Sequence, residues 1–103
     1  MTTLKLRNEP KVQRIEVGND RLDVYLEDGR ILSVPLAWYP RLVHGTPEER
    51  ERYELSGSGH GIHWPDLDED IRVENLLEGR KSGENENSLR RWLARRQPLE
   101  NQS

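Results

Sequence analysis

Residues 61–71 hold the side chains best suited to chemistry in this chain of 103 residues. They include one histidine, one tryptophan and four carboxylates: His63, Trp64, Asp66, Asp68, Glu69 and Asp70. Imidazole and carboxylate groups act as general acids and bases, and they bind metal ions. Charged side chains are almost never fully buried unless they are paired. We therefore expect much of this run to lie at the surface, where it indicates a site without specifying a reaction.

The alternating acids Asp66, Asp68 and Asp70 resemble the opening of a calcium loop, which binds the ion through its positions 1, 3 and 5. Such a loop also needs glycine at position 6 and glutamate at position 12. Ile71 and Leu77 occupy those positions, so the match fails. We expect instead that the three acids lie at the start of a following helix, whose dipole favours negative charge there, or face a partner.

A zinc site would need ligands such as His60, His63 and Asp66, with water as a fourth ligand. If residues 61–64 are extended, His60 and His63 point to opposite faces of the strand, so we expect no metal cofactor. A small metal-dependent hydrolase that uses His63 with Asp66 or Asp68 is kept as a second alternative. The glycines of residues 57–61 lack the strand and helix that flank a phosphate loop, and they predict a flexible connection.

Four arginines form the one basic concentration in a chain of net charge -3: Arg90, Arg91, Arg95 and Arg96. Nucleic-acid-binding domains usually carry a broad basic face, so nucleic acid is the weaker interpretation. Arginine also binds carboxylates and stacks on aromatic rings. The cluster is consistent with an amphipathic helix on its own domain, with docking onto a protein, or with binding to nucleic acid.

The composition predicts one small folded domain with a thin core, because 32% of the residues are hydrophobic and 34% are charged. Burial against a protein partner or a second copy in a homodimer would add stability. The chain has no cysteine, which excludes disulfides and thiolate chemistry. No segment resembles a signal peptide or a membrane span, so we expect a cytoplasmic location and no membrane partner.

Three antiparallel strands are the clearest elements of the predicted fold. The first contains Val12, Ile15 and Val17, and the second alternates apolar and polar residues from Leu22 to Leu26. A three-residue turn with a left-handed Gly29 then places Leu32 and Val34 of the third strand opposite Val24 and Leu22. A slip by one residue would lose this apolar match.

Helix signals follow the sheet. Thr46, Pro47 and Glu49 have the spacing of a capping box, and the helix that they begin is expected to pair Glu48 with Arg52. Tyr53 and Leu55 are expected to turn inward before residues 56–59 close this helix. A fourth strand is predicted at residues 62–64, then a short helix with Leu76 and Leu77 that ends at Gly79.

The C-terminal region predicts a polar linker and a last helix. Ser88 is expected to cap this helix, which carries Leu89, Trp92 and Leu93 on one face. The predicted fold class is α+β, with a small antiparallel sheet of three to four strands, two to three short helices and a C-terminal amphipathic helix. Residues 1–80 form the α+β body, and residues 81–103 form the linker and the C-terminal helix.

Three segments together resemble the bacterial domain-of-unknown-function 2442 family: Val34–Leu42, Thr46–Arg50 and Gly61–Ile71, followed by Glu74 and Leu76-Leu77. The resemblance covers roughly residues 12–96, and Arg72 stands where the family commonly has serine. It implies a compact α+β body, with no established enzymatic activity or cofactor. Some members carry helix-turn-helix domains. Short members are often encoded beside another small protein in toxin–antitoxin-like pairs.

We therefore predict a non-enzymatic protein-interaction module, the antitoxin-like partner of a small protein encoded nearby. Aromatic residues and arginine dominate the energetics of interfaces. The expected surface combines Trp38, Tyr39, Arg41, His63, Trp64, Asp66, Asp68 and Asp70. Leu89, Trp92 and Leu93 form a second anchor that becomes ordered on binding. A nucleic-acid-binding regulator that uses the arginine-rich helix is the first alternative.

Overall fold

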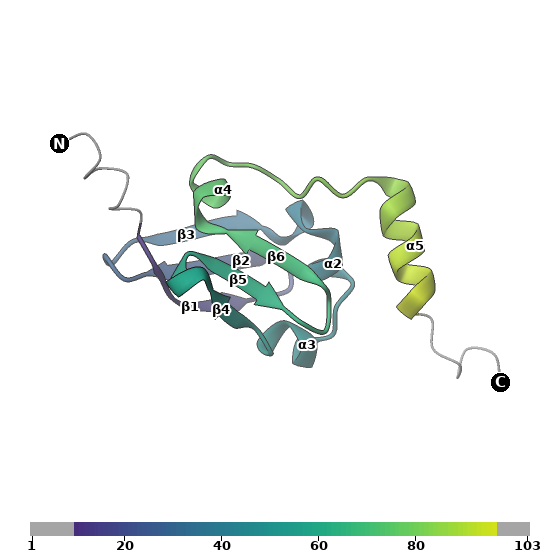
Figure 1. Ribbon diagram of the computed structural model, residues 1–103, viewed down its shortest axis with the longest axis horizontal. Coiled ribbons are helices and arrows are strands. Elements are labelled where there is room, and N and C mark those ends of the chain that lie inside the picture. Colours follow the sequence, from purple (N-terminus) through teal and green to yellow (C-terminus); the bar gives the residue numbers. More distant parts are fainter. Residues whose placement is uncertain (1–9, 97–103) are drawn as a thin grey trace.

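The computed structural model describes residues 10–96, so the ends of the predicted body and tail, residues 1–9 and 97–103, lie outside it. Within these described residues, six strands form two three-stranded antiparallel sheets (Figure 1). The first sheet contains β1 (Val12–Val17), β2 (Arg21–Leu26) and β3 (Ile31–Pro35). The second sheet contains β4 (Glu54–Ser56), β5 (Gly61–Trp64) and β6 (Glu69–Arg72). The helical elements are η1 (Leu36–Trp38), α2 (Pro40–Val43), α3 (Pro47–Glu51), η2 (Gly57–Gly59), α4 (Val73–Leu77) and α5 (Glu86–Arg96).

The first sheet confirms the predicted register. Leu22 lies opposite Val34, and Val24 lies opposite Leu32. Gly29 has φ +97°, a left-handed conformation that glycine adopts without steric cost. Period-2 alternation therefore places the apolar side of β2 in the core, where Leu22 and Val24 are fully buried.

The second sheet was only partly predicted. The α+β class is confirmed, but β5 is the centre of a separate sheet, with β4 and β6 on either side. β4 and β6 were missed because they are only three and four residues long and mostly polar. The glycine-rich segment between β4 and β5 is a tight hairpin turn, in which Ser56 lies opposite Gly61. Leu55, expected to turn inward, is exposed on the edge strand β4.

The capping box of α3 is confirmed. Thr46 Oγ1 accepts a hydrogen bond from Glu49 N at 3.1 Å, and Glu49 Oε1 accepts one from Thr46 N at 2.9 Å. The helix ends sooner than predicted, at Glu51, and Arg52 forms its ion pair with Asp66 instead of Glu48. The predicted helix around Leu76 is α4, followed by Gly79 at φ +73°.

One hydrophobic core joins the two sheets, α2, α4 and α5. Among the described residues, no polar or charged residue is buried in it. The core members are Val12, Ile15, Leu22, Val24, Leu26, Val34, Leu36, Tyr39, Leu42, Ile62, Trp64, Leu67, Ile71, Val73, Leu76 and Trp92. Within residues 10–96, none of the helices has both the length and the apolar character that a membrane crossing requires.

α5 lies at one end of the molecule, beyond the extended segment that follows α4 (Figure 1). It begins at Glu86, two residues before the predicted cap Ser88. Asn85 is the capping residue, because its Oδ1 accepts a hydrogen bond from Ser88 N at 2.7 Å. An isolated helix of 11 residues is only marginally stable, so its packing against the body matters for its stability.

Candidate functional site

Three aromatic residues of the predicted binding surface lie in the core. Trp64, Tyr39 and Trp92 are 0%, 3% and 4% exposed. Trp64 Nε1 donates to the carbonyl oxygen of Arg50 at 3.0 Å, and Tyr39 Oη donates to that of Arg80 at 3.2 Å. A small domain with few apolar residues uses its aromatic rings to fill the interior, because their polar atoms find partners there. The expectation that these three rings face a partner is therefore wrong for this conformation.

The predicted acids lie on the exposed hairpin between β5 and β6 and not at the start of a helix, since α4 follows Arg72. Each acid has one cationic or imidazole partner. Asp66 pairs with Arg52 at 2.6 Å, Asp68 with Arg41 at 3.4 Å and Asp70 with His63 at 2.8 Å. Their side chains remain 38%, 78% and 68% exposed, respectively.

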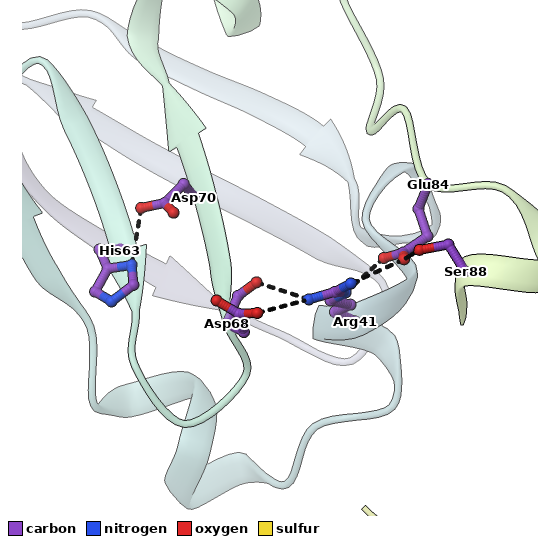
Figure 2. A network of polar contacts seen from close by, with 6 residues as sticks. All are labelled: Arg41, His63, Asp68, Asp70, Glu84 and Ser88. Atoms are coloured by element: carbon purple, nitrogen blue, oxygen red, sulfur yellow. Dashed lines mark hydrogen bonds and ion pairs between the residues drawn. The ribbon is translucent and has the colours of Figure 1, made fainter. Parts of the chain in front are cut away.

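His63 and Asp70 lie directly opposite each other in the ladder of the second sheet (Figure 2). The hydrolase hypothesis expected His63 beside Asp66 or Asp68, and both of these acids instead pair with arginines. His60 lies just before β5, with Nδ1 3.1 Å from the carbonyl oxygen of Gly57. Across residues 10–96, no group of three or more histidine and carboxylate side chains is arranged to hold a metal ion.

Arg41 is the centre of a polar network between α2, the β5–β6 hairpin and the start of α5 (Figure 2). Its Nε and Nη2 donate to both carboxylate oxygens of Glu84, at 2.6 and 3.0 Å. Its Nη1 donates to the carbonyl oxygen of Asp68 at 2.9 Å. The hydrogen bond with Arg41 lowers the pKa of Glu84, and the same bond raises the pKa of Arg41. Ser88 Oγ also donates to Glu84. Arg41 therefore connects α2 to the β5–β6 hairpin and to the residues just before α5. Its side chain is only 15% exposed.

The second predicted anchor faces its own domain. The guanidinium groups of Arg41 and Arg96 both lie over the Trp92 ring, at 5.2 and 4.8 Å from its centroid. Arg96 also binds Glu49 of α3 at 2.8 Å. Leu89 and Leu93 are partly buried against the core. Of the three interpretations of the arginine-rich helix, packing on its own domain is the one observed within the single chain. Three arginines of α5 remain exposed: Arg90, Arg91 and Arg95.

Trp38 is the one aromatic residue of the predicted surface that stays partly exposed. Lys81 Nζ lies 5.7 Å from the centre of its ring. The ring also packs against the core from one side. Trp38 therefore lies where the body meets the segment that leads to α5.

Glu69 is one of the four carboxylates of residues 61–71, but no role was predicted for it. The pKa of Glu69 is raised to about 7, chiefly by burial; Arg41 opposes this rise and the nearby Glu84 adds to it. Burial likewise raises the pKa of the neighbouring Tyr39 to about 12. Glu69 could have been found, because it precedes Ile71 and Val73 at period 2 and so shares their inward face.

The sequence match over residues 12–82 is to the family described as "Protein of unknown function (DUF2442)". The chain belongs to this family. The DUF2442 match ends before Glu84 and α5, so the ion pair between Arg41 and Glu84 includes a residue outside the matched segment.

Two solved structures resemble this DUF2442 protein. A crystal structure of a protein of unknown function from Rhodospirillum rubrum is 26% identical, with a TM-score of 0.65. The alignment covers 75% of this chain and 95% of that one. A solution structure of an uncharacterized protein from Chromobacterium violaceum is 23% identical, with a TM-score of 0.66 and coverage of 92% and 84%. No curated protein matches the chain. The likeness supports the α+β fold.

Proposed function

We propose that this DUF2442 protein is a non-enzymatic protein-interaction module that binds a basic surface of a small protein partner. The observation that supports this most is the acidic hairpin, in which Asp66, Asp68 and Asp70 are exposed and yet each is held by a partner of its own. A set of charges that is ordered before binding loses less conformational entropy on association. Charge complementarity also speeds encounter and suppresses wrong partners.

The ion pairs of the hairpin can be replaced by ion pairs with a protein partner. Pairs between exposed side chains contribute about 0–1 kcal/mol, so a partner's lysines or arginines can join or replace them at low cost. The side-chain exposures of Asp68 and Asp70, 78% and 68%, leave their oxygens open to such contacts. Arg41 is satisfied by Glu84 and acts as the support of this surface.

The partner that we propose is the small protein encoded beside this one, which makes the chain the antitoxin-like half of a cytoplasmic pair. This step follows the gene arrangement common among short members of the family and is an argument by analogy. The basic character of the partner follows instead from the acidic hairpin. The two parts of the proposal can therefore be tested separately.

The test is co-expression of the chain with the neighbouring gene product, followed by size-exclusion chromatography and titration calorimetry. The variant Asp66→Asn/Asp68→Asn/Asp70→Asn is expected to weaken the complex at least about tenfold, because several charge-assisted contacts are lost. The matched control, Asp20→Asn/Glu27→Gln/Asp28→Asn, changes the net charge equally in turns of the first sheet. An equal loss in both variants, or no loss in the first, would overturn the assignment to the hairpin.

The exposed arginines of α5 keep nucleic acid as a second candidate. Arg90, Arg91 and Arg95 are exposed, and none of the three forms an ion pair with a carboxylate of residues 10–96. Binding to phosphates would weaken steeply as salt rises. The variant Arg90→Gln/Arg91→Gln/Arg95→Gln separates the two functions. It should leave the protein complex unchanged under our proposal, whereas nucleic-acid binding by the wild type that this variant abolishes would favour the second candidate.

A further inference from the structure

A polar cavity of about 150 Å³ lies beside the acidic hairpin, under the extended segment that leads from α4 toward α5. Its lining consists of Tyr39, Glu69, Asp70, Ile71, Asn75 and residues 80–83. The covering segment is held at two points, because Tyr39 Oη donates to Arg80 O and Ser82 N donates to Trp38 O at 3.1 Å. A cavity of roughly this volume can hold a group as large as benzene. This space is large enough for a guanidinium or ammonium head.

The side chains at this cavity favour a cation. Glu69, Asp70 and Asn75 offer acceptor oxygens. The two basic residues of the covering segment have other contacts, since Arg80 Nε lies 2.8 Å from Glu78 and Lys81 Nζ lies above the Trp38 ring. The positive charges of Arg80 and Lys81 are therefore engaged in these contacts and do not neutralise Glu69.

The one arginine that acts on Glu69, Arg41, is engaged with other carboxylates. Glu69 interacts with Arg41, Glu84 and Asp70. Arg41 is already bound by Glu84 in a bidentate contact and by Asp68. Four carboxylates (Asp68, Glu69, Asp70 and Glu84) thus share one arginine and the imidazole of His63. A partly buried carboxylate without its own counter-ion is unfavourable, and an incoming cation would relieve it.

We propose that this cavity receives the head of a lysine or arginine side chain from the protein partner, with Glu69 as its anion. The inference rests on the proposed function, because it names the group that enters beside the acidic hairpin. A guanidinium or ammonium head donates several hydrogen bonds, which Glu69, Asn75 and the backbone of residues 80–83 can accept. The cavity then supplies the buried contact of the interface, and the hairpin supplies its charged rim.

The cation preference can be measured without the partner. Ethylguanidinium is titrated into the isotope-labelled full chain near pH 8, and N-ethylurea serves as a neutral probe of similar shape. Amide shifts are expected at the residues that line the cavity, with ethylguanidinium binding more tightly than N-ethylurea. Glu69→Gln should weaken the binding about tenfold, because a charge-assisted hydrogen bond becomes a neutral one. Asp20→Asn, a remote acid, should leave it unchanged. Equal binding of the two probes, or equal affinity in Glu69→Gln, overturns the proposal.

The same variants in the protein complex distinguish this inference from the proposed function. Glu69→Gln should weaken the complex about tenfold, and Asp20→Asn should not. A complex that forms and is insensitive to Glu69→Gln overturns the cavity proposal and leaves the interaction module standing. Absence of any complex, together with probe binding that depends on Glu69, overturns the proposed partner while the cation preference of the cavity is confirmed.

Discussion

Glu69 and Glu84 lie near the same arginine, but their pKa values shift in opposite directions. Glu84 accepts two hydrogen bonds from Arg41, and this contact lowers its pKa. Glu69 loses solvent without a comparable partner, so its pKa rises. The difference shows that orientation decides which carboxylate the guanidinium stabilises, because a bidentate contact serves only one carboxylate in full. Glu69 is consequently the acid whose charge a partner or a change of pH can most readily alter.

The first prediction concerns pH. The pKa of Glu69 is about 7 in the folded chain, against an ordinary value of 4.5. Between these values the folded state binds more protons than the unfolded state, so the free energy of unfolding falls as pH rises from about 5 to 7. The loss attributable to Glu69 is at most about 3 kcal/mol. Urea unfolding of the wild type and Glu69→Gln at about pH 5 and pH 8 measures it.

Comparison with the variant isolates Glu69, because every other titratable group is the same in the two proteins. Glu69→Gln should be more stable than the wild type near pH 8 and should show a flatter dependence on pH. Parallel pH profiles for the two proteins would show that Glu69 does not cause the slope.

The helix α5 is attached by a few specific contacts. Trp92 supplies the apolar part, the Arg41–Glu84 pair anchors the residues just before the helix, and the Arg96–Glu49 pair holds its last residue. Glu49 serves at the same time as the capping-box residue of α3. The start of α3 and the end of α5 are therefore coupled through one carboxylate.

The second prediction is that Arg41→Gln loosens α5. Glu84 is 6% exposed at its side chain, and removal of its cation would leave a largely buried charge unpaired. Breaking such a pair typically costs about 3–5 kcal/mol. Hydrogen exchange should show faster exchange of the amides of residues 86–96, together with a lower free energy of unfolding.

Arg14→Gln is the matched control. It removes an arginine from the exposed pair with Glu16, whose side chains are 49% and 56% exposed. Exposed pairs of this kind contribute about 1 kcal/mol or less. If the two variants lost the same free energy of unfolding, the Arg41–Glu84 ion pair would not be the contact that attaches α5 to the body.

The molecule as a whole has a core that extends from the two sheets to α5. Trp92 belongs to the same hydrophobic cluster as Leu22 and Trp64. The division into a body of residues 1–80 and a tail of residues 81–103 remains a prediction. The shared core indicates that both parts contribute to the same free energy of unfolding.

The third prediction tests that division. A chain that ends at residue 80 should keep its sheets, because none of the six strands lies beyond Arg72. It should lose about 3 kcal/mol or more, since the truncation removes buried Trp92 and the partner of Arg41. Far-ultraviolet circular dichroism and urea unfolding measure the two effects. A chain that ends at residue 96 keeps both contacts and serves as the control. Equal stability of the two truncated chains would contradict the shared core.

The elements that the sequence predicted well depend on rules that act over short stretches of chain. The alternation of Leu22, Val24 and Leu26 specifies the inward face of β2, and a left-handed Gly29 specifies the register of the hairpin. The capping box at Thr46 is also local, because its two hydrogen bonds join residues three positions apart. Such patterns are visible in one dimension since the interacting atoms are brought together by the geometry of a single element.

Tertiary structure alone decided which charged side chains pair and which aromatic rings are buried. Arg41 and Glu84 are separated by 43 positions, and Arg52 had both Glu48 and Asp66 as available acids. Exposed pairs differ little in free energy, so the positions of the elements select among them. Trp64 was expected near the surface because of its polar neighbours, but packing of the two sheets buries it fully. The sequence by itself determined the local strands, turns and caps, and the packing of distant elements determined the cavity at Glu69 and the surface left for a partner.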